Sequence, residues 1–186
     1  MNDYSIALFL HIVGALGYIV ALSLEWTGLR QIRSATPSAQ VRAWMGIFKS
    51  ASKVGFASML TTVISGIYMV LTEEGGAAWV FVTLGALVLL IVLSAALTAP
   101  RMEAIGQALA AENGAVSKTF HSLANHPLLW VSVQTRVAIV LGIVFLKAAK
   151  PDLGGSLLTI GVAIALGIAS ALPLPRRVRA QEGSAD

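Results

Sequence analysis

The residues best suited to chemistry in this chain are polar side chains inside otherwise apolar segments. In the first such segment His11, Tyr18 and Glu25 recur every seven residues, so on an α-helix they share one face. Ionisable groups in a membrane helix rarely face lipid, and a neutral imidazole there can ligate haem iron or a metal, or pass protons. His11 is therefore a candidate ligand for a cofactor such as haem b.

A second axial ligand for haem would have to come from another segment. Met69 is the candidate, because His/Met ligand pairs occur in cytochromes. The other two histidines fall in a long polar connection, too far along the chain to reach His11. The alternative is structural: His11 would form a hydrogen bond to a neighbouring helix, with Ser65 or Tyr68 as its partner.

A second polar place is expected near the other end of the first segment. Counting the helical rise puts Glu25 close to Lys49, Lys53 and Arg136, and a carboxylate at that depth needs a cationic partner or a proton. We expect these four residues to form a buried polar cluster. Three cations against one carboxylate would favour an anion there, such as a lipid phosphate, a carboxylate substrate or a porphyrin propionate. The simpler alternative is an ion pair that locks two helices together.

Small residues recur in the same segments as these polar side chains. They let helix backbones approach closely where the bilayer supplies no hydrophobic drive for helix association. We expect the first two helices to pack along a seam that comprises Gly14, Gly17, Ala21, Gly28, Ser65 and Gly66.

The composition places these residues in a membrane protein. The chain of 186 residues is 56% hydrophobic and 12% charged, whereas an ordinary soluble domain is about 25% charged. A bilayer core about 30 Å thick needs about 20 apolar residues of helix, and five segments qualify. The prediction is an all-α integral membrane bundle of five transmembrane helices, over residues 6–24, 54–71, 77–99, 128–146 and 153–172.

The basic residues predict the orientation. Short cytoplasmic loops retain Lys and Arg. With the N-terminus outside and the C-terminus in the cytoplasm, all but Lys147 and Lys150 of the 13 basic residues lie on the cytoplasmic side. We therefore expect a bacterial inner-membrane protein in contact with anionic lipid on that side, and the net charge of +4 gives no reason to expect a nucleic-acid partner.

The remaining parts of the chain are predicted to lie at the cytoplasmic face. Residues 28–44 would form a basic loop between the first two spans, and residues 101–126 an amphipathic segment whose first helix ends at Asn113 and Gly114. Residues 1–174 would make one transmembrane domain, followed by a basic tail over residues 175–186.

Several classes of chemistry are excluded or lack support. The chain has no cysteine, which excludes disulfides, thiolate metal sites and covalent c-type haem. The nucleotide-binding, metalloprotease and serine-hydrolase motifs are missing, and no metal site is predicted. We find no internal repeat of the kind on which many stand-alone transporters are built.

Three stretches of the chain resemble an uncharacterised family of small bacterial polytopic membrane proteins. They are FLHIVGALGYIVAL, FKSASKVGFASMLTTVISGIYMVL and TRVAIVLGIVFLKAAKPDLGGSLL. The first two helices are also distantly similar to the CopD-like copper-resistance proteins and to the HemJ-like protoporphyrinogen oxidases. In HemJ-like proteins a histidine of the first helix is linked to haem b, and the resemblance implies that role for His11.

The sequence thus favours a non-catalytic membrane component or accessory subunit that packs through small-residue seams, with a further copy of itself or another membrane protein as the expected partner. Two alternatives stay open. One is a haem-binding or porphyrinogen-oxidising membrane protein that uses His11, with Tyr18, Lys53 and Arg136 as secondary candidates. The other is a small transporter or ion pathway along His11, Tyr18 and Glu25.

Overall fold

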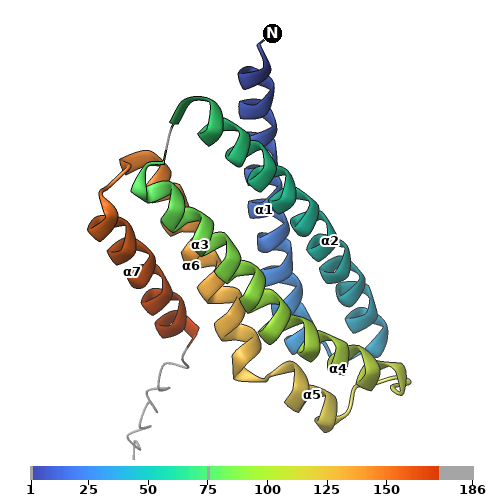
Figure 1. The fold of residues 1–186 in the computed structure, drawn as a ribbon. Coiled ribbons are helices and arrows are strands. Elements are labelled where there is room, and N and C mark those ends of the chain that lie inside the picture. Colours follow the sequence, from blue (N-terminus) through green and yellow to red (C-terminus); the bar gives the residue numbers. More distant parts are fainter. Residues whose placement is uncertain (1, 75, 172–186) are drawn as a thin grey trace, which may run out of the picture.

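The computed structural model describes residues 2–74 and 76–171, and every regular element in them is a helix (Figure 1). Five helical stretches are long and apolar enough to cross a membrane. The predicted all-α class and the five candidate spans are thereby confirmed, while the predicted basic tail lies outside the described residues. In chain order the elements are α1 (Asp3–Ser34), α2 (Ser38–Met69), η1 (Val70–Glu74), α3 (Ala78–Leu93), η2 (Ser94–Thr98), α4 (Ala99–Ala110), α5 (Lys118–Ala124), α6 (Pro127–Ala149) and α7 (Leu153–Ala171).

The first two helices are longer than the predicted spans. The side chain of Asn2 caps α1, which runs to Ser34, and α2 begins at Ser38. The predicted basic loop over residues 28–44 is therefore wrong, because most of it is helical. Apolar side chains continue at helical spacing on both sides of the turn and are buried, as Leu29 and Val41 show.

The third candidate span also extends further than predicted. Helix α3 passes through the π-helical turn η2 directly into α4. Pro100, which has no N–H to donate, follows the turn, and Nη1 of Arg101 donates to the carbonyl of Leu97, 2.8 Å away. The predicted amphipathic segment is thus split between an extension of the third span and the separate helix α5. Helix α4 ends at Ala110, before the predicted stop, and Gly114 adopts a left-handed φ of 102° in the connection that follows.

The helices fall into two groups. Helices α1 and α2 form a hairpin packed along their lengths, while α6 packs against α7 and α3 contacts both of them. The short helices α4 and α5 lie at the end of the bundle opposite the N-terminus (Figure 1).

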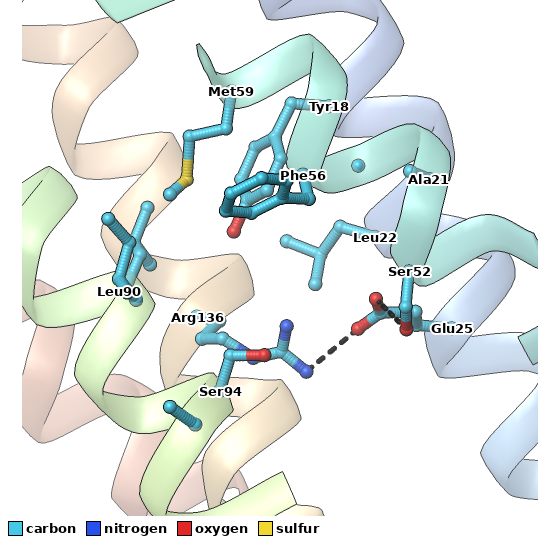
Figure 2. A pocket seen from close by; sticks show the side chains of 13 residues that line it. Tyr18, Ala21, Leu22, Glu25, Ser52, Phe56, Met59, Leu90, Ser94 and Arg136 are labelled. Atoms are coloured by element: carbon cyan, nitrogen blue, oxygen red, sulfur yellow. Dashed lines mark hydrogen bonds and ion pairs between the residues drawn. The ribbon is translucent and has the colours of Figure 1, made fainter. Parts of the chain in front are cut away.

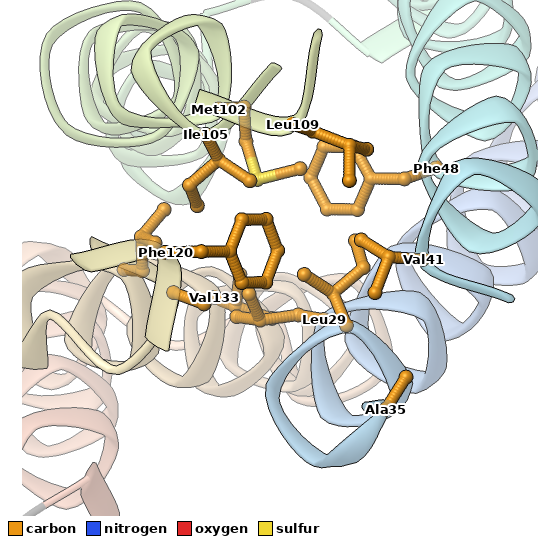
Figure 3. Packing of buried hydrophobic residues seen from close by; sticks show 12 residues of the cluster. Leu29, Ala35, Val41, Phe48, Met102, Ile105, Leu109, Phe120 and Val133 are labelled. Carbon is orange, nitrogen blue, oxygen red and sulfur yellow. The ribbon is translucent and has the colours of Figure 1, made fainter. Parts of the chain in front are cut away.

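A buried apolar cluster joins the two groups at the α4–α5 end (Figure 3). Phe120 of α5 is fully buried among side chains from α1, α2, α4 and α6. Burial of apolar surface stabilises this end independently of any surrounding lipid. The cluster comprises Leu29, Ile32, Ala35, Val41, Phe48, Met102, Ile105, Leu109, Phe120, Ala124, Leu129 and Val133.

Candidate functional site

Glu25 and Arg136 form a buried ion pair between α1 and α6 (Figure 2). Nη2 of Arg136 lies 2.8 Å from Oε2 of Glu25, and the two side chains are 3% and 6% exposed, respectively. The hydroxyl of Ser52, on α2, donates a hydrogen bond of 2.7 Å to Oε1 of the same carboxylate. Helices α1, α2 and α6 are thus joined at one carboxylate.

The two lysines predicted for this cluster lie elsewhere. Lys49 and Lys53 are exposed on α2, so the prediction of a buried four-residue cluster is wrong for both. Adjacent helical residues point about 100° apart, and it is Ser52, one position before Lys53, that faces Glu25. The carboxylate therefore meets one buried cation, and the surplus of positive charge expected to favour an anion is not present in this cluster.

A chain of hydrogen bonds extends from Arg136 to the π-helical turn. Nη2 of Arg136 lies 3.5 Å from Oγ1 of Thr98, which lies 2.9 Å from the hydroxyl of Ser132. Ser132 in turn donates to the carbonyl of Leu93, 3.1 Å away, just before the turn η2. Each side chain in this series can donate a hydrogen bond to the next group, from Arg136 to the Leu93 carbonyl. The prediction missed Thr98 and Ser132, although their polarity inside apolar segments was the signal that could have found them.

A cavity of about 210 Å³ lies beside the ion pair, between the hairpin and the second helix group (Figure 2). Its polar wall includes Glu25 and Arg136, and the hydroxyl of Tyr18 points into the same space. Nε of Arg136 is buried and has no hydrogen-bond partner among the described residues. The other lining side chains are Ala21, Leu22, Ser52, Gly55, Phe56, Met59, Leu90, Ile91, Ser94 and Ala95.

His11 lies at a separate polar place between α1 and α2. Its Nδ1 is 2.9 Å from the carbonyl oxygen of Thr62 and 3.4 Å from the hydroxyl of Ser65. Because a carbonyl can only accept, we assign the proton to Nδ1, which donates to Thr62. Ser65 was one of the partners expected from the sequence, whereas the Thr62 carbonyl was not. His11 is not among the residues that line the cavity beside Glu25.

The surroundings of His11 bear on the expected haem ligand pair. The imidazole rests on α2 at Gly66, where an added Cβ would lie 3.0 Å from Cε1 and 3.2 Å from Nδ1. Met69 is buried on the same helix α2. A porphyrin held by His11 and Met69 would have to lie between α1 and α2 at a level where the two helices are already in contact. These residues therefore do not fit a haem with that pair of axial ligands.

The α1–α2 hairpin is held by close backbone approach. A Cβ added at Gly14 would lie 2.6 Å from Oγ1 of Thr62 and 2.8 Å from the carbonyl oxygen of Ser58. One added at Gly17 would lie 2.5 Å from the Ser58 hydroxyl. At Gly14 the close atoms include the backbone of α2, so the hairpin requires glycine there, whereas the Ser58 hydroxyl beside Gly17 can rotate away.

The other small residues of the predicted seam differ in how tightly they are packed. Ala21 is 1% exposed, and its Cβ lies 3.1 Å from the position that a Cβ at Gly55 would take. Gly28 has more room, since a Cβ there would first meet Phe48 at an ordinary 3.6 Å.

The structure adds a second close contact, between α6 and α7, that was not predicted. A Cβ at Gly167 would lie 2.5 Å from Cα of Thr135, and one at Gly142 would lie 3.2 Å from Cβ of Ala163. The sequence contains both glycines, but it does not indicate which helix each of them faces.

Tryptophan and basic side chains gather at the α4–α5 end of the bundle. The rings of Trp26 and Trp130 lie 5.9 Å apart between centroids. The guanidinium of Arg30 lies 4.8 Å from the Trp26 centroid, and that of Arg33 lies 5.3 Å from the Trp130 centroid. Such contacts combine cation–π attraction with the amphipathic character that Trp and Arg show at membrane surfaces.

A matching group lies at the opposite end. Nζ of Lys147 and Nζ of Lys150 lie 5.1 and 5.7 Å from the ring centroid of Trp79. Along α6, Trp130 and Lys147 are separated by about 26 Å at 1.5 Å per residue. This spacing is close to the thickness of a bilayer core, about 30 Å.

No protein-family model matches this chain, and no curated protein or solved structure is significantly similar to it. In the part of the chain that the structure describes, no three His, Asp or Glu side chains are grouped so that they could hold a metal ion. The arrangement around Glu25 and Arg136 can lock helices together and can offer hydrogen bonds to a molecule in the adjoining cavity.

Proposed function

We propose that this chain is a non-catalytic, multi-pass component of the bacterial inner membrane. The observation that carries this proposal is that Trp and basic side chains gather at both ends of the candidate spans. One cluster lies around Trp26 and Trp130, and the other lies around Trp79. Trp, Lys and Arg anchor helices at the two surfaces of a bilayer, and the helices between these groups expose large apolar side chains.

The proposed orientation has the N-terminus outside and the α4–α5 end in the cytoplasm. Arg30, Arg33, Arg42 and Lys118 belong to that end, where they would meet the headgroups of anionic lipids. Lys147 and Lys150 belong to the opposite end, so the asymmetry favours this orientation over its reverse.

A structural role for the buried charges supports the non-catalytic assignment. The carboxylate of Glu25 is engaged by Arg136 and Ser52, and His11 is engaged by the Thr62 carbonyl. Each polar place joins one helix to another. A transport path along one polar face has less support, because the cavity includes Tyr18 and Glu25 but not His11.

Labelling of single cysteines tests the placement in the membrane. Because the chain contains no cysteine, Gly154→Cys and Ala111→Cys each create one thiol, and both positions are exposed. A membrane-impermeant maleimide is expected to label G154C in intact cells, and A111C only after the inner membrane is permeabilised. The reverse pattern would contradict the orientation, and recovery of the protein in the soluble fraction would contradict the membrane role.

A further inference from the structure

The cavity beside the Glu25–Arg136 pair combines a polar inner wall with an apolar opening. Phe56 of α2 and Ile91 of α3 line it and are 64% and 45% exposed, so the cavity opens between these helices toward the surface that would face lipid. Its volume of about 210 Å³ would hold about seven groups the size of a water molecule, at about 30 Å³ each. The cavity thus accommodates the head and first carbons of a chain molecule whose remainder lies among the lipids.

The inner wall presents polar side chains to a molecule in the cavity. Oε2 of Glu25 is already engaged by Nη2 of Arg136, whereas Nε of Arg136 is a buried donor with no hydrogen-bond partner among the described residues. The Tyr18 hydroxyl points into the same space (Figure 2). Buried polar groups are normally hydrogen-bonded, because leaving them unpaired costs free energy. A group that both donates and accepts, such as a hydroxyl, would complement this wall.

The charge of the wall selects a neutral head. Glu25 and Arg136 neutralise each other, and Lys49 and Lys53, the cations that could have attracted an anion, are exposed on another part of the α2 surface. A charged headgroup would lose its hydration on entering and gain no uncompensated opposite charge in return. A hydroxyl group carries a much smaller desolvation cost.

A local irregularity of the backbone adjoins the same cavity. Ser94 and Ala95 line it and belong to the π-helical turn η2. Such turns interrupt regular helices rarely and frequently occur at functional sites. Here the turn also carries Thr98, which links it to Arg136.

We propose that this cavity binds the hydroxyl head of a neutral, single-chain lipid-like molecule, whose tail leaves between Phe56 and Ile91. This site goes beyond the proposed function, since a structural membrane component requires no ligand.

Photo-crosslinking tests the site. The full chain is placed in nanodiscs of phosphatidylethanolamine and phosphatidylglycerol with hexadecanol that carries a diazirine in mid-chain, and adducts are located by mass spectrometry. We expect saturable labelling of the peptides that contain Phe56 and Ile91, displaced by unlabelled hexadecanol but not by hexadecane. Labelling that is spread over lipid-facing positions such as Leu141 and Leu158 and is not displaced would overturn the proposal. Displacement by hexadecane, or stronger displacement by anionic palmitate, would overturn the assignment of a neutral hydroxyl head.

Matched variants separate the site from general lipid contact. Ala95→Trp places a large side chain at the cavity mouth, whereas Ala96→Trp alters the neighbouring exposed residue, which does not line the cavity. A95W is expected to reduce saturable labelling at least about tenfold and A96W to leave it unchanged. Tyr18→Phe removes one hydroxyl and keeps the ring, and it is expected to weaken competition by hexadecanol about fivefold, the effect of one hydrogen bond. Unchanged labelling in both A95W and Y18F would refute the site.

Discussion

Nη2 of Arg136 lies 2.8 Å from the carboxylate of Glu25, and this contact joins α1 and α6 inside the bundle. Removing one partner leaves the other charge buried and uncompensated. Glu25→Gln and Arg136→Gln are therefore each expected to lower the free energy of unfolding by about 3–5 kcal/mol, measured by denaturant titration in detergent micelles. The double variant should lose less than the sum of the two, with a coupling energy of about 0.5–3 kcal/mol.

A matched control for these variants is Glu103→Gln, which removes an exposed carboxylate of α4. It should leave the free energy of unfolding nearly unchanged, because exposed charges contribute little to stability. If the effects of E25Q and R136Q were simply additive in the double variant, the ion pair would not be the stabilising interaction.

The contact of Gly167 with α6 predicts a sharp difference between two glycines of α7. Gly167→Ala would place a Cβ 2.5 Å from the backbone of Thr135, whereas nothing lies within 4 Å of a Cβ added at Gly161. G167A is expected to destabilise the protein by about 1–3 kcal/mol through overpacking. G161A should be neutral or slightly stabilising, since alanine favours helix more than glycine does. Equal thermal stabilities of the two variants would show that α7 does not pack closely on α6 at Gly167.

The hydrogen bond from His11 to the Thr62 carbonyl predicts a structural effect of His11→Ala. Loss of this interhelical bond should cost about 0.5–2 kcal/mol in unfolding free energy. Ile12→Ala is the control, because Ile12 is 49% exposed and faces away from the hairpin contact.

An absorption spectrum of the same purified proteins separates this structural role from a haem-binding one. The wild-type protein from haem-supplemented cells is expected to show no Soret band. Its spectrum should therefore match that of His11→Ala. Such a band, lost in H11A and kept in I12A, would instead establish His11 as a haem ligand.

The connection between α4 and α5 predicts a pH effect at Glu112. Hydrogen bonds from Ser117 hold the pKa of the Glu112 carboxyl below its ordinary value of 4.5. The contribution of this interaction to folding is therefore present above pH 4.5 and is lost as the pH falls through the lowered folded-state pKa. A carboxyl NMR titration should show the lowered pKa, and Ser117→Ala should raise it toward the ordinary value. An unshifted pKa in the wild-type protein would contradict the contact.

The partner of Glu25 shows where reasoning from the sequence stops. That a carboxylate in an apolar segment needs a cation follows from the cost of burying a charge, and this pointed to Arg136 among three candidates. Which candidate was correct depended on the rotation of α2 about its axis. Ser52 and Lys53 are adjacent in the chain, yet only Ser52 faces the carboxylate.

The same division applies to the helices. Their class and the five candidate spans were predictable, because length and hydropathy are local properties of the chain. The ends of α1 and α2 were not predictable, because the basic residues in 28–44 suggested a loop. Leu29 and Val41 pack under α4 and α5, and this packing holds their segments in helices.

By itself, then, the sequence determined that this is an all-helical chain with five apolar segments and a few polar residues that require partners inside it. The tertiary structure alone decided that Arg136, rather than a lysine, pairs with Glu25, that Gly167 meets Thr135, and that a cavity remains beside the ion pair. The physical reason is that burial costs and helix propensities act on each residue locally, whereas the facing of two helices is set by the combined packing of many side chains far apart in the chain.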